Sequence, residues 1–364
     1  MRILFWLYIT TIISFSIDIP QKYPSYSYVF GEFDIDSEYI YDEGFNKFVE
    51  IHHKEYKRFY DNSIRRGGYL ATTFKSMLIE NNLSDLFLYL SMVESGLKLD
   101  ALSPKSATGV WQFMRQTAKE YNLSVDSNFD ERLDPILSTT AAIEYLHKLH
   151  QKFGKWYLAM MAYNCGEGRL QKGINRAKSD DIEILTDTKA RYIPKETRLY
   201  IYKILLLSMI GENISLGFTD EGMEYLYGDE IVQVEVNAGE NIDSIAKLID
   251  IKPKKLRELN HHFKSGTIPV ILPHYMINIP SSKVVDFYTL YMFKREINSS
   301  PTNHLISHIV SEGETIKLIA NRYGTTIGEI ISTNSLRAEA LKRGDILIIP
   351  VSKNVFEKWS NISK

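Results

Sequence analysis

Glu94 is the residue in this chain best suited to proton transfer. It closes the apolar run LSDLFLYLSMVE and is followed at once by Ser95 and Gly96. If this run is a helix, Leu90 and Phe87 lie on the same face as Glu94, one and two turns earlier. A carboxyl on an apolar face keeps its proton to higher pH, because burial penalises the charged form, and this suits a general acid. The alternative is a solvated glutamate at a helix end, and the run by itself leaves both readings open.

Polar side chains also interrupt three later apolar segments. Gln112 stands within VWQFM, where a buried amide is either held in a hydrogen-bond network or faces a ligand. Tyr163 and Asn164 end the nearly all-apolar run WYLAMMAYN, which predicts a buried helix whose polar end lies where the core opens. Tyr200 lies in the apolar helix pattern PKETRLYIYKILLLSMI. The sequence thus offers several polar groups to accompany one carboxyl.

Helical patterns that would position these groups extend over residues 45–217. Asp134-Pro135 predicts a helix start, with Asp as the N-cap, and Gly96 predicts a helix end. No strand pattern occurs in this range, so we expect a compact all-α domain. Residues 17–44 mix Tyr, Pro, Ser and acidic residues without periodicity, and they predict an extended lead-in.

Two short repeats follow the helical region. NAGENIDSIAKLID matches SEGETIKLIANRYG, 74 positions later, and each copy closes on a strand that ends in proline, INIP and LIIP. Residues 231–280 and 306–351 therefore predict two small α+β modules of βααβ order, and residues 281–305 predict a linker. In the second copy, Thr326 and Glu329 form a capping box that opens the second helix.

The composition of the 364 residues excludes several classes of protein. A net charge of −2 argues against nucleic acid as the main partner, since nucleic-acid-binding proteins need a basic face. The single cysteine, Cys165, excludes an intrachain disulfide and a zinc site built on several thiolates. We expect no metal and no cofactor.

Residues 1–16 predict an export signal. Arg2 supplies the positive charge, Ile3–Phe15 form a short apolar core, and the small residues Ser14 and Ser16 precede a cleavage point. The core is short for a membrane-spanning helix, and an uncleaved anchor is the alternative. In either case we expect an exported protein.

Three ordered motifs resemble those of one known family. VESGLKLDALSPKSATGVWQFM, AYNCGEG and PKETRLYIYK are similar to the motifs of the soluble-lytic-transglycosylase catalytic domain, within the lysozyme-like superfamily. They are closest to the membrane-bound lytic murein transglycosylase D group. The two repeats resemble LysM modules, which bind the N-acetylglucosamine glycan of peptidoglycan and chitin. The resemblance implies an all-α lysozyme-like catalytic domain followed by two small α+β LysM-like modules.

The resemblance assigns roles to individual residues. Glu94 corresponds to the catalytic acid and Ser95 to its neighbour in the Glu-Ser motif, while Gln112 lines the sugar groove. The remaining family positions, which hold or position the substrate, are Tyr163, Asn164 and Tyr200.

The chain departs from the family pattern at three positions, none of which removes a functional group. Arg115 stands where proline is usual, Ser106 where glycine is common, and Cys165 where alanine is common. The first LysM copy is the more degenerate of the two repeats.

The resemblance also implies an activity. It implies cleavage of the bond between N-acetylmuramic acid and N-acetylglucosamine without water, with Glu94 acting first as acid and then as base, and 1,6-anhydromuramyl ends as the product. The implied partners are peptidoglycan glycan strands and, through LysM, N-acetylglucosamine-containing glycan. The implied location is the periplasm of a Gram-negative bacterium, with or without attachment to the membrane through the N-terminus. No cofactor is implied.

Two other functions stay open at the level of sequence. A lysozyme-type peptidoglycan hydrolase would need a second carboxyl. Asp126, Asp130, Glu131 and Asp134 are available, but they lie in a polar stretch where solvation or helix capping is the expected role. The other is a non-catalytic wall-binding protein, and the retention of Glu94 with its accompanying polar residues argues against it.

Overall fold

The structure of the chain is a computed structural model that describes residues 17–127, 129–219, 229–270, 274–298, 304–334, 336, 341–352 and 355–357. The chain divides into two compact units, unit 1 from Met1–Asp61 with Lys148–Met223 and unit 2 from Asn62–His147 with Glu224–Lys364. The export signal predicted for residues 1–16 lies outside the described residues. Within those that are described, no helix is both long and apolar enough to cross a bilayer.

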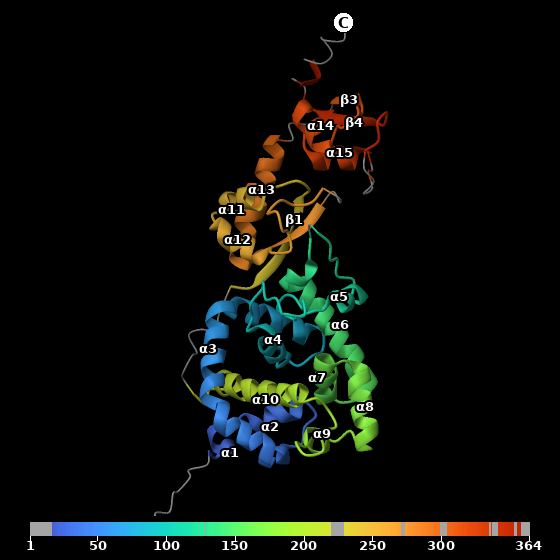
Figure 1. The fold of residues 1–364 in the computed structure, drawn as a ribbon. Helices are drawn as coiled ribbons and strands as arrows, with labels where there is room; N and C mark the ends of the chain where they lie inside the picture. The colour runs from blue at the N-terminus through green and yellow to red at the C-terminus, as the bar shows by residue number, and fades with distance from the viewer. Residues whose placement is uncertain are drawn as a thin grey trace, which may run out of the picture. The chain divides into compact units, whose positions relative to one another are not determined.

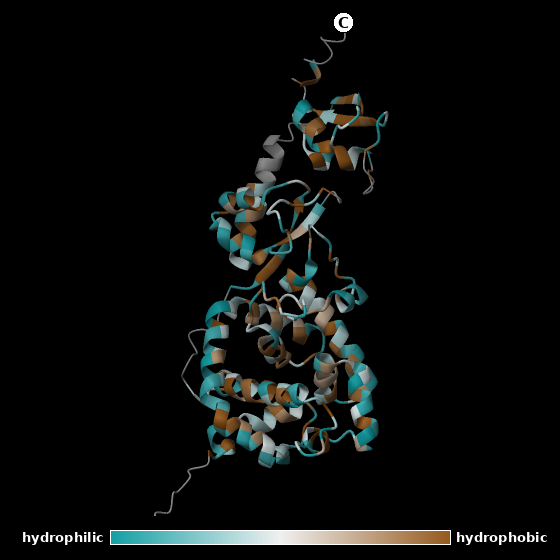
Figure 2. Ribbon diagram, viewed as in Figure 1, coloured by the Kyte–Doolittle hydropathy of each residue, from teal (hydrophilic) through white to brown (hydrophobic). Residues whose placement is uncertain are grey.

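All regular secondary structure in the described part of unit 1 is helical. Its elements are α1 (Ile19–Lys22), α2 (Tyr26–Glu32), η1 (Ser37–Tyr41), α7 (Trp156–Cys165), α8 (Glu167–Ala177), α9 (Ile182–Thr186) and α10 (Lys195–Ser215), with parts of α3 (Glu43–Glu80) and α6 (Pro135–Phe153). α10 is the buried centre and packs against α7 and α2, and Figure 1 shows it alongside α2. Apolar residues accordingly line much of α10, whereas α8 presents a hydrophilic face (Figure 2).

Residues 17–44, expected to be an extended lead-in, instead form α1, α2 and η1. Phe30 and Tyr39 in this segment are fully buried. The ring of Phe30 lies 5.9 Å from that of Phe45, at the start of α3. Aromatic side chains order this segment by packing against a helix that follows later in the chain. Because this packing does not require a periodic pattern, the sequence of the segment shows none.

The helical part of unit 2 contains the second half of α3, most of α6, and the elements α4 (Phe87–Ser95), α5 (Arg115–Glu120) and η2 (Glu131–Leu133). α3 kinks at Gly67, where φ is −128° and ψ is 25°. A Cβ on Gly67 would lie 2.7 Å from the Cβ of Leu97, so the absence of a side chain lets the segment after α4 approach α3. The β pairings among the described residues of this part are isolated bridges, and the prediction of an all-α fold is confirmed.

Two small α+β modules complete unit 2, and their predicted βααβ order is confirmed. The first consists of β1 (Ile231–Asn237), α11 (Ile242–Leu248), α12 (Pro253–Leu259) and β2 (His274–Pro280). The second consists of β3 (His304–Ile309), α14 (Ile316–Tyr323), α15 (Ile327–Asn334) and β4 (Ile346–Val351). Each pair of strands is antiparallel, with Ile231 opposite Pro280 and His304 opposite Val351. In each module the short helices cover the two-stranded sheet and form a small apolar core.

An equivalent polar contact occurs within each of the two modules, and it supports the alignment of their sequences. Asn260, at the end of α12, donates through Nδ2 to the carbonyl oxygen of Asn278 and accepts from its backbone amide, both at 2.8 Å. Asn334 makes the same two bonds to Ile348 of β4, at 2.6 and 2.7 Å. In both modules an asparagine side chain therefore joins the second helix to the closing strand.

Residues 281–305, expected to be a linker, contain η4 (Ser281–Lys283) and helix α13 (Val284–Asn298). Phe287 and Tyr291 of α13 lie in the core of the first module, with their rings stacked at a centroid distance of 4.7 Å. Tyr291 Oη also accepts a 2.9 Å hydrogen bond from the backbone N–H of Asn237, at the end of β1. The first module thus extends beyond the repeat, because a two-stranded sheet with two short helices buries little apolar surface alone.

Buried contacts join the first module to the helical part of unit 2. Asn278 of β2 donates through Nδ2 to Oδ2 of Asp134 at 2.9 Å, and the backbone N–H of Asp130 donates to the carbonyl oxygen of His262 at 3.1 Å. The side chains of Asp134, His262 and Asn278 are almost completely inaccessible to solvent. The chain itself therefore covers this face of the first module.

Candidate active site

Helix α4 places Glu94 at the end of a buried apolar helix. Phe87 and Leu90, predicted to share its face, are fully buried, whereas Glu94 is half-buried. α4 ends at Gly96, which has a φ of 62°, a left-handed conformation that glycine adopts without strain. Ser95 donates through Oγ to the carbonyl oxygen one turn earlier, at 3.2 Å, so its hydroxyl is used within its own helix.

Two contacts fix the end of α4 within unit 2. Arg66 on α3 donates through Nε and Nη2 to the carbonyl oxygen of Gly96, at 3.2 and 2.5 Å. Ser91, fully buried on α4, donates through Oγ to the carbonyl oxygen of Val110 at 3.2 Å. The first contact satisfies a carbonyl just past the helix end, and the second joins the helix to the turn that carries Gln112. The backbone around Glu94 is therefore held from two sides.

Gln112 is held by the loop from which it projects. Its Nε2 donates to the carbonyl oxygens of Gly109 and Ala101, at 2.8 and 3.2 Å. Both amide hydrogens are thus engaged, which leaves Oε1 as the acceptor that the side chain offers. The turn itself requires glycine at position 109, since φ is +82° and a Cβ would lie 1.9 Å from the carbonyl oxygen of Arg132.

Arg132 of η2 stabilises the same turn through hydrogen bonds. Its Nη1 donates to the carbonyl oxygens of Ser106 and Phe113, both at 3.1 Å, and its Nε and Nη2 donate to Asp130. Arg132 is only 7% exposed, and the Asp130 carboxylate balances its charge. Arg132 therefore acts as a structural cation that keeps the loop before Gln112 closed.

The four carboxyls considered as a second catalytic group all have structural partners. Asp130 pairs with Arg132 at 2.8 Å, and Asp134 Oδ1 accepts from the first two amides of α6 at 2.8 and 2.9 Å. Asp126 and Glu131 accept from backbone amides of their own loop, at 2.9 and 2.5 Å. Burial raises the pKa of Glu131 above its ordinary value. Ion pairing, helix capping and loop closure thus account for these carboxyls.

In unit 1, Thr197 orients Asn164. Thr197 is fully buried in the first turn of α10, and its Oγ1 donates to Oδ1 of Asn164, in the last turn of α7, at 2.8 Å. Because this bond engages Oδ1, Nδ2 of Asn164 is left to donate to another group. Tyr163 beside it is half-buried, and Tyr200, one turn along α10 from Thr197, is 4% exposed.

The structure places Glu94, Ser95 and Gln112 in unit 2, and Tyr163, Asn164 and Tyr200 in unit 1. Two positioning residues, Thr197 and Arg132, were not predicted from the sequence. Thr197 carried a signal, because it lies in the PKETRLY motif that pointed to Tyr200. Arg132 carried none, because its acceptors include backbone carbonyls that no sequence pattern reveals.

Three family models match this chain. Residues 72–186 match the transglycosylase SLT domain, residues 230–292 match the LysM-like domain of lytic transglycosylase MltD, and residues 308–350 match the LysM domain. Residues 72–186 belong to the transglycosylase SLT family. This SLT domain contains Glu94 and four of the five other site residues, and the two modules that follow it are of LysM type. The resemblance seen in the motifs is confirmed.

Similar proteins include named transglycosylases. The chain is 31% identical to membrane-bound lytic murein transglycosylase D of Escherichia coli K12 over 277 residues, which are 71% of this chain and 58% of that protein. The protein of the same name from Escherichia coli O6:H1 gives the same values, so the chain spans somewhat more than half the length of these curated relatives. Among solved structures, the 70 kDa soluble lytic transglycosylase of Escherichia coli is similar over 40% of this chain and 24% of its own, with 22% identity and a TM-score of 0.34.

Proposed function

We propose that the chain is a peptidoglycan lytic transglycosylase that cleaves the β-1,4 bond from N-acetylmuramic acid to N-acetylglucosamine. The observation that carries the proposal is Glu94 at the end of buried helix α4, inside the SLT domain. The four carboxyls of residues 126–134 that were considered as a second catalytic group are engaged in structural contacts, which favours a mechanism with one carboxyl over a hydrolase with two.

Glu94 performs both proton transfers in this mechanism. Protonated Glu94 donates to the glycosidic oxygen as the bond from C1 of the muramyl ring breaks, and the N-acetylglucosamine leaves with a hydroxyl group. The resulting carboxylate takes the proton of the C6 hydroxyl of the same muramyl ring, and O6 closes on C1. The product is a 1,6-anhydromuramyl end, Glu94 is protonated again, and no water is consumed. The attack is intramolecular, so orientation replaces a second reactant.

The other motif residues bind or position the sugar. Gln112 offers Oε1, because the loop holds both of its amide hydrogens. Asn164 offers Nδ2, because Thr197 holds its Oδ1. We assign roles to Ser95, Tyr163 and Tyr200 from their positions in the family motifs.

The LysM modules hold N-acetylglucosamine-containing glycan near the catalytic domain. We assign this binding first to the second module, because buried contacts with the helical part of unit 2 cover one face of the first module. The proposed location is the periplasm of a Gram-negative bacterium, with residues 1–16 as a cleaved signal or as an anchor. A named relative is a membrane-bound enzyme, which favours the anchor.

Purified sacculi provide the test. Glu94→Gln is expected to lower the release of soluble fragments by at least the roughly 10²–10⁴-fold typical of general acid–base catalysis. Glu80→Gln, an exposed glutamate at the end of α3, is the matched control and is expected to act like the unmodified protein. Near-normal release by Glu94→Gln would contradict the assignment. Binding of sacculi without release by the unmodified protein would favour a wall-binding function instead.

A further inference from the structure

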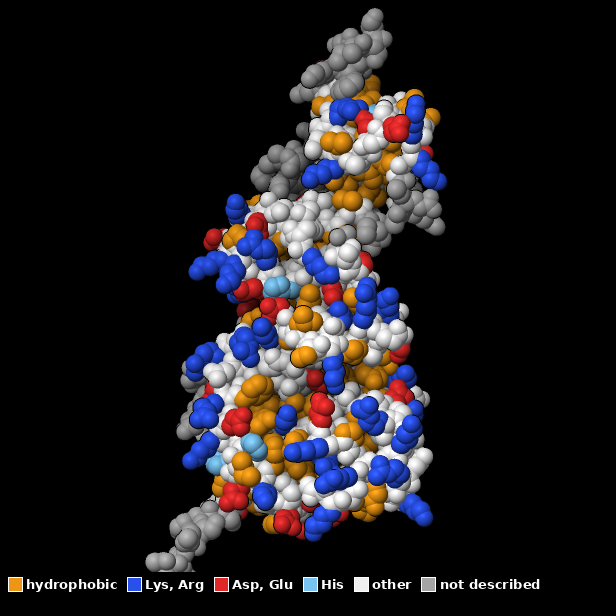
Figure 3. All heavy atoms as spheres, viewed as in Figure 1, with side chains coloured by type: hydrophobic (Ala, Val, Ile, Leu, Met, Phe, Trp, Pro, Cys, Tyr) orange, Lys and Arg blue, Asp and Glu red, His pale blue; other side chains and the backbone are white. Residues whose placement is uncertain are grey.

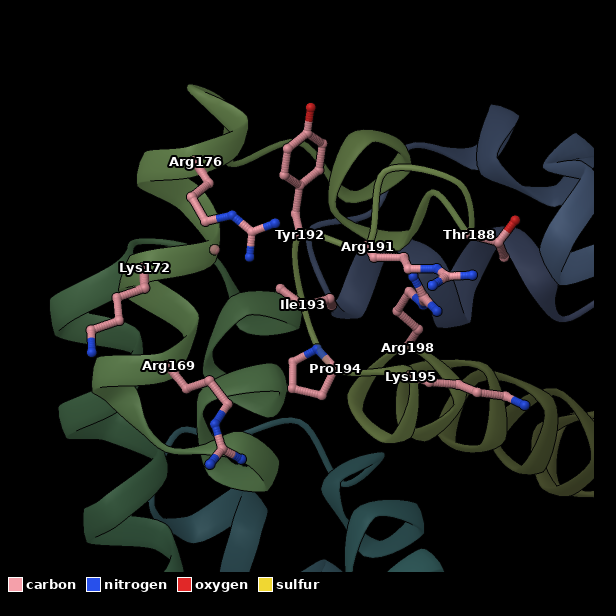
Figure 4. A pocket seen from close by; sticks show the side chains of 11 residues that line it. Arg169, Lys172, Arg176, Thr188, Arg191, Tyr192, Ile193, Pro194, Lys195 and Arg198 are labelled. Atoms are coloured by element: carbon pink, nitrogen blue, oxygen red, sulfur yellow. The ribbon is translucent and has the colours of Figure 1, made fainter.

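A strongly basic pocket of about 660 Å³ lies in unit 1, between α8 and the segment that leads into α10 (Figure 4). Its lining contains no acidic residue and six basic ones: Arg169, Lys172, Arg176, Arg191, Lys195 and Arg198. The first three come from α8 and the others from the far side of the pocket. On the face drawn in Figure 3, lysine and arginine side chains gather over the region of α8 to α10. We name this feature the basic pocket.

The positive charge of the basic pocket is not balanced by carboxylates of the described residues. Within the described part of the chain, the contacts of these six side chains include no ion pair with a carboxylate. Glu167, at the start of α8, pairs with Lys152 at 2.6 Å. The carboxylate of Asp187 accepts from backbone amides of its own turn. Like charges gathered without counter-charges repel each other, so an anion would stabilise the arrangement.

The burial of Arg198 distinguishes the basic pocket from a patch of exposed surface cations. Its side chain lies in the wall of the basic pocket and is only 7% exposed. The guanidinium carries five N–H donors, and its hydrogen bond in the structure joins Nη1 to the carbonyl oxygen of Asp187 at 3.0 Å. A buried cation is costly without an anionic partner, and none of the described residues pairs a carboxylate with Arg198. A carboxylate ligand in the pocket would supply it.

We propose that the basic pocket binds the carboxylate-rich peptide stem of peptidoglycan. Its volume is that of a site for a small ligand, and its cations are spread over α8, α10 and the segment between α9 and α10 instead of forming one cluster around a single phosphate. Tyr192, Ile193 and Pro194 lie between the two groups of cations and offer apolar contact. A ligand with several carboxylates joined by short aliphatic segments matches this pattern, and arginine binds carboxylates in bidentate fashion. The identity of the ligand rests on the proposed function, whereas its chemistry follows from the pocket.

Binding of the free stem peptide L-alanyl-γ-D-glutamyl-meso-diaminopimelate to the full chain, measured by calorimetry, tests the proposal. Arg169→Gln and Arg191→Gln change exposed side chains that make no hydrogen bond to any described residue, so the fold should persist. Each is expected to weaken binding about tenfold or more, because a charge-assisted hydrogen bond is lost. Arg58→Gln, an exposed arginine of unit 1 outside the pocket, is the matched control and should leave the affinity unchanged.

Further arms separate this proposal from its alternatives. The peptide with its carboxylates amidated should not bind, and added salt should weaken binding of the free peptide. Glu94→Gln should bind the peptide with the affinity of the unmodified protein, so loss of turnover and loss of peptide binding are distinguishable. Equal binding of the amidated peptide, or no effect of Arg169→Gln and Arg191→Gln, would overturn the proposal. So would arginine-dependent binding to phosphatidylglycerol vesicles without binding of the peptide, which would make the ligand a lipid headgroup.

Discussion

Asn278 donates a 2.9 Å hydrogen bond to Oδ2 of Asp134, and both side chains are completely buried. The other oxygen of Asp134 caps the first amides of α6, so one carboxylate serves the helix and the first module together. The second module has Ile348 at the position that corresponds to Asn278. The sequence of the first LysM copy therefore differs from that of the second at a position that contacts the helical part of unit 2. This contact gives a structural reason for the difference.

Replacing Asn278 by isoleucine, the residue of the second module, is expected to lower the free energy of unfolding by about 1–3 kcal/mol. The substitution leaves a buried carboxylate oxygen of Asp134 without its donor. Hydrogen exchange at the capped amides of Ile136 and Leu137 should accelerate. Asn321→Ile makes the same chemical change at an exposed site of α14 and should stay within about 0.5 kcal/mol of the unmodified protein. Equal stability of the two variants would show that the contact does not stabilise the fold.

We expect His262 to make the stability of the same interface depend on pH. Burial lowers the pKa of His262 below its ordinary value of 6.5, although the carboxylate of Asp134, 3.3 Å from Nδ1, acts in the opposite direction. The unfolded chain therefore takes up a proton below about pH 6.5, while the folded protein takes it up only at lower pH. Above about pH 6.5, His262 is neutral in both states and does not lower the free energy of unfolding. As the pH falls below this value, the free energy of unfolding decreases by up to about 1.4 kcal/mol per pH unit.

Urea unfolding between about pH 5 and pH 8 measures this dependence. His262→Gln is expected to flatten the pH profile of the free energy of unfolding, whereas His52→Gln, on the outer part of α3, should keep the slope of the unmodified protein. An unchanged slope in His262→Gln would mean that other groups cause the acid sensitivity.

Gly109 allows a second test of local geometry. Gly109→Ala is expected to destabilise the protein by about 2 kcal/mol or more, because the new Cβ meets the carbonyl oxygen of Arg132 and φ is positive. Gly313 has a similar φ of +79° with nothing near its Cβ position, so Gly313→Ala should cost only the backbone strain of about 1–2 kcal/mol. Thermal unfolding of the two variants isolates the steric part. Equal shifts would show that the turn relaxes around the added methyl group.

The sequence predicts the features of this fold that depend on neighbouring residues. Gly96 ends α4, Asp134 caps α6, and Thr326 and Glu329 form the predicted capping box at 3.0 and 3.1 Å. Each of these depends on a few adjacent groups. Residues 17–44 and the helix α13 could not be predicted, because they are ordered by aromatic side chains that pack on distant elements. Arg132 and Thr197 escaped for the same reason, since their partners are brought close only by the folded chain.

Thr197 should affect turnover through Asn164. Thr197→Val removes the 2.8 Å hydrogen bond to Oδ1 while it keeps the shape of the side chain, and is expected to lower kcat by about fivefold to tenfold with little change in KM. Thr197→Ser keeps the hydroxyl and should restore most of the rate. A merely structural role would lower the unfolding temperature of both variants and leave kcat of the folded fraction unchanged.

We propose that Glu94 transfers protons within one muramyl residue and that water does not attack. Digestion of sacculi in H₂¹⁸O, followed by mass spectrometry of the released muropeptides, tests this most directly. We expect 1,6-anhydromuramyl ends without ¹⁸O, formed by the unmodified protein and by Glu80→Gln but not by Glu94→Gln. Reducing muramyl ends that carry ¹⁸O at C1 would contradict this proposal and would identify a hydrolase.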